Sequence, residues 1–530
     1  MDFPPSKRLA TSNRALEVQR LLRTTVSPDS RNVITQYLND VERDIRSYEA
    51  EINQHKAAIM ALESRRNNMK KMAEKYRFLL SPVHRLPPEI LASIFGYCCE
   101  RNVLTPEEPP PAMVLSMVCG RWREILLSTP SLWASIDIIT DWWDPDDYSM
   151  LDRIAQIFIL RSRSQPLTLS LNMEQLLPTF QLVAFVNALI STSSRWKSLQ
   201  LSLETSTARD FGLDAIRGKL PLLEYLDLQV WVYDDTAFEV FDAFQECPVL
   251  HTATFFCQYE FYAHFIFPWH QIRTITFRNT DSQEALSQLS LCRNIRDAKL
   301  FCVGDQPHYE GRIVNSIENL HVVAIKQADV SAVYQALTLP HLSSMQLEGR
   351  GPTDPIDWTD WDEQPVQDFF VRSSCSLTSL SLKWLRISDE QTISLLQLLP
   401  TLQSLSVEEY YFGQTSASTR PNRIVSSTFL NHLSIDHATP SPRGQFLPRL
   451  TDLVLTVHPC APDHAALSNA VATRWLPDRE FALEIGVQCL RTLTLKLIGH
   501  DSEAARGLFS SFECFRDVGM QISVSYVPVS

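Results

Sequence analysis

The hydrophobic pattern divides the chain into three parts, of which the first is a long helical repeat. From residue 32 to residue 80 there is no proline or glycine, and apolar side chains recur at alternating intervals of three and four. This spacing predicts one long helix over 33–80, preceded by a polar segment, 1–32, that we expect to be flexible. The apolar seam consists of Leu38, Val41, Ile45, Tyr48, Ile52, Ile59, Leu62, Met69, Ala73, Tyr76 and Leu80.

Two interpretations of this seam stay open. A heptad seam of this length is typical of a coiled-coil dimer or a partner helix, whereas a single helix folded back on its own domain has the same pattern. The seam is interrupted at His55 and Arg66, which weakens the case for a dimer. A basic cluster near the helix end is either a nuclear signal or a solvated face. It consists of Arg65, Arg66, Lys70, Lys71, Lys75 and Arg77.

A second apolar pattern begins in the stretch HRLPPEILASIF, residues 84–95. Proline has a fixed φ and no amide hydrogen, and both features suit the first turn of a helix. Glu89 stands in the same turn, where the helix dipole favours a negative charge. Ile90, Leu91, Ile94 and Phe95 then form an apolar face, which serves either the protein's own core or a partner.

After a proline-rich break at 106–111, a further amphipathic helix is predicted from Val114 to Thr129. Strand-like sequence follows it. Residues 137–166 contain an acidic, tryptophan-bearing linker and the first helix of the next region. We therefore expect a small helical domain at 81–136 and a separate connecting segment at 137–166.

From residue 167 to 530 a short apolar pattern repeats, as in LPLLEYLDL (220–228) and LPTLQSLSV (399–407). Most steps between successive anchors fall in the twenties, which is the period of a leucine-rich repeat. The twelve anchors are Leu199, Leu223, Leu250, Ile272, Ile295, Ile317, Leu342, Leu377, Leu402, Leu430, Leu450 and Leu490.

The repeats predict an α/β fold class with a solenoid of short parallel strands and outer helices. Each unit contributes a strand that cannot bury its apolar face alone, so neighbouring units must stack. Segments 235–247 and 389–400 are predicted to be helices of the outer layer, and 428–437 to contain a repeat strand. The alternative is an ordinary α/β domain with leucine-rich strands, which twelve similarly spaced copies make the weaker interpretation.

Composition and charge narrow the function classes. The chain of 530 residues has a net charge of −13, but residues 1–80 carry a balance of +5 and the remainder a balance of −18. An acidic main body argues against a nucleic-acid partner. No apolar run is long enough for a membrane span, and the 11 cysteines form no C-x-x-C pair. These features predict a cytoplasmic or nuclear protein with reduced thiols.

Two stretches together resemble the F-box: LPPEILASIF and VCGRWREILLSTPSLW. The first helix of that motif is matched by Leu86, Pro87, Glu89, Ile90, Leu91, Ile94 and Phe95, and the later one by Val118, Cys119, Trp122 and Arg123. The segment between them, 101–112, is longer and richer in proline than in compact F-boxes. With the preceding helix and the degenerate repeats, the arrangement looks like the large F-box families of filamentous and mushroom-forming fungi.

This resemblance implies a partner and a role. F-box proteins dock on a Skp-type adaptor, which joins them to a cullin and RING ubiquitin ligase, and their C-terminal domain selects the protein substrate. The matched face, with Val118 and Trp122, would then enter a groove of the adaptor. Such a subunit needs no catalytic residue and no cofactor, because the ligase carries the chemistry. The alternative is a scaffold that binds through its coiled coil and solenoid without ubiquitin ligase function.

The substrate side offers one distinctive candidate and no catalytic motif. The insertion PTDPIDWTDWDEQP places Asp357, Asp360 and Asp362 beside two tryptophans, Trp358 and Trp361. These groups would suit a basic segment through charge and cation–π contacts, or else the tryptophans pack on the solenoid flank. No phosphate-binding or hydrolase motif occurs, and His458, Cys460 and His464 lack a fourth metal ligand.

Overall fold

A computed structural model describes most of the chain. The described residues are 16, 18–20, 22–23, 27–139, 143, 147–173, 180–204, 211–231, 240–257, 261–280, 282–302, 311–324, 327–349, 363–385, 387–409, 424–437, 445–457, 464–498, 512 and 514–527. The chain divides into two units, residues 1–91 and 92–530, and each is described by itself.

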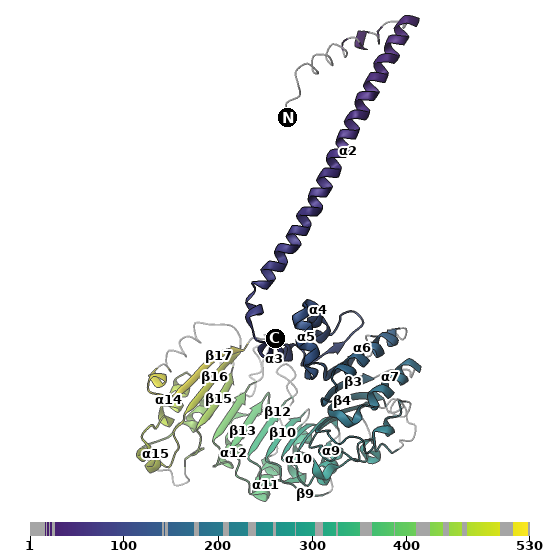
Figure 1. The fold of residues 1–530 in the computed structure, drawn as a ribbon. Coiled ribbons are helices and arrows are strands. Elements are labelled where there is room, and N and C mark those ends of the chain that lie inside the picture. The colour runs from purple at the N-terminus through teal and green to yellow at the C-terminus, as the bar shows by residue number, and fades with distance from the viewer. Residues whose placement is uncertain are drawn as a thin grey trace. The chain divides into compact units, whose positions relative to one another are not determined.

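The first unit is dominated by one helix, α2 (Pro28–Leu79), which Figure 1 shows as a single uninterrupted rod. The Ser27 side chain caps its start by accepting a hydrogen bond from the Ser30 amide at 3.3 Å. Its end coincides with the prolines that follow: a short 3₁₀ turn (Pro82–Arg85) leaves Leu86 extended with ψ 134°. The predicted long helix is confirmed, with Pro28 rather than residue 33 as its first residue.

Helices and the first strands alternate after that turn. They are α3 (Pro88–Cys98), β1 (Val103–Leu104), α4 (Pro111–Val118), α5 (Gly120–Ser128), β2 (Ser135–Ile139), α6 (Tyr148–Arg161), β3 (Leu167–Met173) and α7 (Phe180–Ile190). One amphipathic helix was expected from Val114 to Thr129, and this is wrong. Cys119 is extended (φ −160°, ψ 169°) and caps α5, its Sγ accepting from the Trp122 amide, so the segment becomes two helices.

The remaining strands follow at intervals along the chain. They are β4 (Trp196–Glu204), β5 (Tyr225–Trp231), β6 (Thr252–Cys257), β7 (Thr274–Thr280), β8 (Asp297–Cys302), β10 (Asn319–Ala324), β12 (Ser344–Glu348), β13 (Ser379–Lys383), β14 (Ser404–Glu408), β15 (Asp452–Val457), β16 (Thr492–Ile498) and β17 (Gln521–Val527). Together with β1–β3 they form one sheet of fifteen parallel strands among the described residues, and chain order equals sheet order. A separate pair joins β9 (Ile313–Val314) and β11 (Leu337–Thr338).

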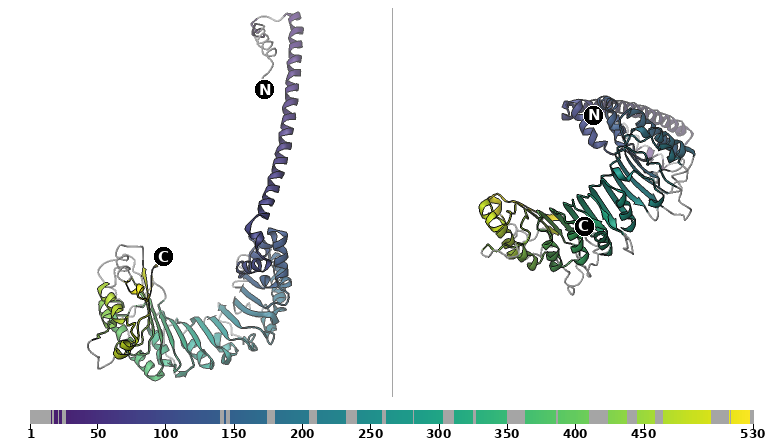
Figure 2. Two further views of the ribbon diagram at one scale, coloured as in Figure 1. Left: turned by 60° about the vertical axis from the view of Figure 1, so that its left-hand side comes forward. Right: turned by 90° about the horizontal axis from the view of Figure 1, so that it is seen from below.

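Helices cover one face of this sheet (Figures 1 and 2). Successive helices pack side by side along it: α9 (Ser282–Leu291), α10 (Gln327–Ala336), α11 (Glu363–Ser373), α12 (Asp389–Gln397), α13 (Ser427–Leu433) and α14 (His464–Arg474). Another short helix, α15 (Arg479–Ile485), follows α14. The predicted mixed α/β fold with a parallel, solenoid-like sheet is confirmed. Ten of the twelve anchors stand two residues before the first residue of a strand, Leu199 lies inside β4, and each of these eleven is at most 1% exposed.

Two local expectations are wrong. Residues 240–247 were predicted to be helical, but they form a bridge and turns, in which Phe241 pairs with Phe265. The unit anchored at Leu430 contributes helix α13 instead of a strand, and β14 pairs directly with β15. Ser426 caps that helix, and Phe429, Leu430 and Leu433 are buried at helical spacing. A leucine pattern this short fits both structures.

A buried arginine holds the region around α13 and α14 together. Arg474 is 1% exposed, and its guanidinium donates to the backbone oxygens of Leu433, Phe446 and Leu447. Burial lowers its pKa to about 10, so the group is still charged at neutral pH. Its charge is therefore balanced by the dipoles of the three carbonyls that accept its hydrogen bonds.

The change Arg474→Met should lower the free energy of unfolding by about 3 kcal/mol or more, because it removes three charge-assisted hydrogen bonds to buried or partly buried carbonyls. Arg479→Met, at an exposed position five residues away, is the matched control and should change it by less than about 0.5 kcal/mol. Urea unfolding followed by circular dichroism compares the two. Equal midpoints would show that the buried guanidinium does not stabilise this region.

Candidate functional site: helices α3 to α5 and the open face of the sheet

Helix α3 has two apolar sides that serve different purposes. Leu91 and Phe95 are each 1% exposed, whereas Ile90 and Ile94 are 48% and 43% exposed. Tyr97 continues the outward side one turn on and is 79% exposed. The expectation that all four matched residues enter a partner's groove is therefore wrong for Leu91 and Phe95, which are core residues. The outward stripe runs at i, i+4 and i+7 instead.

Helix α4 presents a second apolar stripe. Val114, Met117 and Val118 stand at i, i+3 and i+4, and they are 45%, 61% and 47% exposed. Trp122 on α5 is half-buried because its ring lies against Phe95, with centroids 4.8 Å apart. Of the other predicted residues, Pro87 and Glu89 are exposed and Leu86 is half-buried. The structure thus keeps Val118 on the surface and gives Trp122 a packing role.

A buried asparagine, which sequence reasoning missed, organises these helices. Asn102 is fully buried, and its Nδ2 donates to the backbone oxygens of Leu132 and Ser135, each at 3.1 Å. Its Oδ1 accepts from the Ala112 amide at 3.1 Å, which fixes the first turn of α4. The signal was present: a lone Asn between the two apolar helices, just before the proline-rich segment.

An ion pair and a buried tryptophan also stabilise this region. Arg101 Nε donates to Asp137 Oδ2 at 2.9 Å, and this carboxylate is almost wholly buried on β2. Trp133 Nε1 donates to the Leu126 carbonyl at 2.9 Å, and its ring packs on Phe158 of α6. The exposed stripes of α3 and α4 therefore belong to helices that rest on a polar and aromatic frame.

The comparison with protein families identifies this region. Residues 83–139 match the F-box-like family. The matched segment begins within the 3₁₀ turn Pro82–Arg85 and contains α3 to α5 and the first two strands of the sheet.

The other comparisons add no functional name. The comparison with curated proteins finds no match. Among solved structures 14 chains match. One is a chain of the crystal structure of the mouse RP105/MD-1 complex, which is 12% identical over 76% of this chain and 80% of that chain, with a TM-score of 0.24. A superposition this loose carries no argument.

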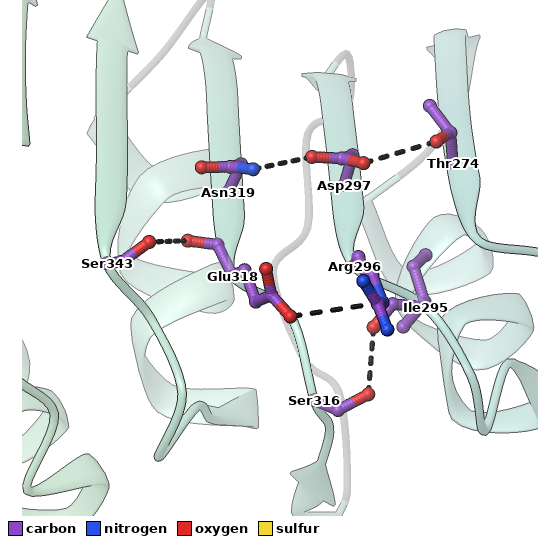
Figure 3. A network of polar contacts seen from close by, with 8 residues as sticks. All are labelled: Thr274, Ile295, Arg296, Asp297, Ser316, Glu318, Asn319 and Ser343. Carbon is purple, nitrogen blue, oxygen red and sulfur yellow. Dashed lines mark hydrogen bonds and ion pairs between the residues drawn. The ribbon is translucent and has the colours of Figure 1, made fainter.

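Beyond the F-box-like domain, the open face of the sheet is lined by rows of polar side chains set by the strand register. One row begins at each strand's first residue and contains mainly Ser, Thr, Asn and Asp. Asp297 Oδ1 accepts from Asn319 at 2.6 Å, and its Oδ2 accepts from Thr274 at 3.2 Å (Figure 3). These cross-strand bonds satisfy a row of side chains that none of the described helices covers.

A hollow of about 600 Å³ opens beside this row, at the amino-terminal ends of β7, β8 and β10. Figure 3 shows Arg296 and Glu318 at this edge, with 3.9 Å between Nε and Oε1. Arg273 and His341 also line it. Both partners of the Arg296–Glu318 pair are largely exposed, so they contribute little to stability and are accessible to a ligand.

Charged residues gather in the next rows, along β8 to β13. His321 Nε2 lies 2.8 Å from Glu348 Oε2, which also accepts from Gln346 at 2.7 Å. Lys299 on β8 pairs in register with His321, and Lys383 on β13 pairs in register with Glu348. Burial and the charge of Lys299 lower the pKa of His321, and the contact with Glu348 acts against them. The imidazole is therefore expected to be neutral at physiological pH, leaving a mixed-charge surface.

Several predicted residues cannot be placed. Asp357, Trp358, Asp360, Trp361 and Asp362 lie outside the described residues, and so do His458 and Cys460. The described part of the chain contains no group of three metal-binding side chains. In the same ranges, no helix combines the length and apolar character needed to cross a bilayer.

Asp227 on β5 provides a pH-dependent test of the open face. Its carboxylate is 4% exposed and lies 3.4 Å from Arg278 Nη2. Burial raises its pKa, and the Arg278 charge opposes the rise only in part. The raised pKa means that Asp227 ionises less readily in the folded state than in the unfolded state. The folded state therefore loses stability as pH rises above the unfolded pKa of about 3.9.

Asp227→Asn should therefore be more stable than the wild type at pH 7, and the difference should shrink as pH falls toward 4. Urea midpoints measured across this pH range give the result, with the exposed Asp214→Asn as the matched control. A variant less stable than the wild type at pH 7 would mean that the Arg278 pair outweighs the burial cost.

Proposed function

We propose that this protein is a non-catalytic substrate-recognition subunit of an SCF-type ubiquitin ligase. The F-box-like domain would dock on a Skp-type adaptor and, through it, on a cullin and RING ligase. The parallel-strand domain, which we interpret as degenerate leucine-rich repeats, would select a protein substrate. The observation that carries this proposal is the exposed apolar stripe of α3 within a segment that matches the F-box-like family.

Docking through α3 and α4 is energetically reasonable. Ile90 and Ile94 together leave two half-exposed side chains whose full burial would contribute about 2–4 kcal/mol. Val114, Met117 and Val118 extend the apolar area on a second helix. An amphipathic helix with an i, i+4, i+7 stripe suits a hydrophobic groove, and the buried partners Leu91 and Phe95 keep α3 rigid before it binds.

The substrate side rests on different features. Rows of Ser, Thr, Lys and Glu side chains on an uncovered sheet suit an extended polar surface of a protein, with the hollow beside Arg296 as a further contact. The insertion containing Asp357, Trp358, Asp360, Trp361 and Asp362 stays a candidate for a basic substrate segment. A fungal family origin and a cytoplasmic or nuclear location stay predictions.

The test is co-purification of the full chain with a Skp-type adaptor. Ile90→Asp/Ile94→Asp should weaken binding at least about a hundredfold, since it removes two apolar contacts and places two charges against a groove. Leu160→Asp is the matched control: this side chain on α6 is 77% exposed, and the variant should bind like the wild type. Circular dichroism verifies that all three chains are folded.

Two outcomes would overturn the proposal. If the wild type does not bind the adaptor, the F-box-like domain has no ubiquitin ligase role, and the scaffold alternative takes over. If the double variant binds as tightly as the wild type, the exposed stripe of α3 is not the docking surface. Substitution of Phe95 would not decide the question, because loss of this core residue disturbs the domain itself.

A further inference from the structure

Helix α2 carries an exposed apolar seam that needs a covering partner. Ten of its large apolar seam residues, from Leu38 to Leu80, are between 46% and 75% exposed in the single chain. A helix of this length obtains most of its stability from packing of an apolar face, not from helix propensity. The seam is the largest run of exposed apolar side chains on any one described element.

The seam defines a heptad frame. Positions a fall at residues 38, 45, 52, 59, 66, 73 and 80, and positions d at 41, 48, 55, 62, 69 and 76. The flanking e positions are Glu42, Glu49, Lys56, Glu63, Lys70 and Arg77, and the charged g positions are Asp44, Glu51 and Arg65. These flanks are mainly acidic in the first half of the helix and mainly basic in the second. Flanking charges set partner choice and orientation in coiled coils.

A parallel pair of such helices would be unfavourable. Asp44 would meet the partner's Glu49, and Arg65 would meet the partner's Lys70, each contact occurring twice. Only Glu51 would find an opposite charge, the partner's Lys56. In the core, Arg66 would face its own copy across the same layer, where two guanidinium charges repel.

An antiparallel pair reverses each of these conflicts. When residue numbers facing each other sum to 121, every a position from Ile45 to Leu80 lies level with a partner d position. In this register Glu42 lies near the partner's Arg77, and Glu49 near the partner's Lys70. Lys56 likewise lies near the partner's Glu63, so all six e positions meet an opposite charge. The neighbouring g positions bring no like charges together.

The same register explains the two polar interruptions of the seam. Arg66 falls in the same layer as the partner's His55, so both faults occupy the same two symmetry-related layers. Elsewhere Ile52 faces the partner's Met69, and Ile59 faces the partner's Leu62. A polar residue at a core position specifies register at some cost in stability. Within one chain, Glu63 Oε1 lies 3.7 Å from Arg66 Nη2, and Glu51 Oε1 lies 3.8 Å from His55 Nε2. Each polar residue of this layer therefore has a carboxylate of its own helix beside it.

We infer that α2 mediates self-association of this protein as an antiparallel two-stranded coiled coil in this register. The occupant of the seam is a second copy of the chain. The overlap from Val41 to Leu80 spans about 60 Å, and the contact is two-fold symmetric. The two Leu79 residues would lie about 55 Å apart along the pair, so the two F-box-like domains would start near opposite ends. The inference does not depend on adaptor binding.

Charge reversal tests the orientation in the full chain without any adaptor. Glu49→Lys replaces two attractions per dimer by repulsions and should raise the dissociation constant about tenfold, as should Lys70→Glu. The double variant Glu49→Lys/Lys70→Glu should restore wild-type affinity. Glu74→Lys makes the same charge change at an exposed position outside the seam and its flanks and is the matched control. Sedimentation equilibrium gives the constants.

Each outcome of this experiment supports or contradicts antiparallel self-association. A parallel dimer predicts the opposite sign, because Glu49→Lys and Lys70→Glu would each relieve a repulsion and tighten association. A wild-type chain that stays monomeric up to about 100 μM, well above typical specific affinities, would overturn self-association and support a helix folded back on its own domain. If single and double variants all bind like the control, the flanking charges do not set the pairing, and the register is wrong.

Cross-linking gives an independent measure of the register. A mixture of Ile52→Cys chains and Met69→Cys chains should form a mixed disulfide dimer, because residues 52 and 69 share a layer in this register. Either variant alone should form no more dimer than the oxidised wild type, which controls for the native cysteines. Cross-linking of Met69→Cys chains with themselves would show a parallel pair instead.

Discussion

The structure depends on the lateral pairing of parallel strands, whose inward leucines are buried by neighbouring strands and by the helices that cover one face of the sheet. A single short strand exposes its apolar face unless the next unit packs against it. The anchor residues are almost fully buried along the entire sheet, and each buried leucine contributes about 2 kcal/mol. Stability therefore arises from contacts between units, and interruption of one strand exposes the inward face of its neighbours.

The same strand pairing extends into the F-box-like domain. Strands β1 and β2 lie within residues 83–139, yet they pair with each other and then with β3 in the same sheet. Asn102 and Asp137, which hold the helices of this domain, stand beside or on these strands. The frame beneath the exposed stripe of α4 is thus continuous with the first strands of the sheet. An adaptor bound there would contact a preorganised surface, which lowers the ordering cost of docking.

The pattern of repeats was readable from the sequence because its signal is strong and redundant. Apolar residues, mostly leucines, recur at fixed offsets in a dozen units, so the strand that follows Leu402 or Leu450 could be placed without any structure. The exposed side of α3 was harder to predict. Ile90 and Leu91 are adjacent and equally apolar, and only the packing of Phe95 against Trp122 decides which of them faces inward.

The misplaced elements share one physical cause. Around Leu430, a short apolar pattern fits a strand and a helix equally well, and the Ser426 cap selects the helix. Cysteine is not among the preferred N-cap residues, yet Cys119 caps α5 and separates it from α4. Asn102 was missed because a single buried amide leaves no periodic signal. The caps at Ser426 and Cys119 join residues three apart, and Asn102 bonds to Leu132 and Ser135, but none of these hydrogen bonds adds to the apolar spacing from which the elements were predicted.

The most direct measurement of the central claim is hydrogen exchange of the full chain with and without a Skp-type adaptor. The account predicts added protection of amides in residues 88–98 and 111–118, with no change in the strands from β4 onward. Exchange that is unchanged in both helices, or protection found only in the strands, would contradict docking through the F-box-like domain.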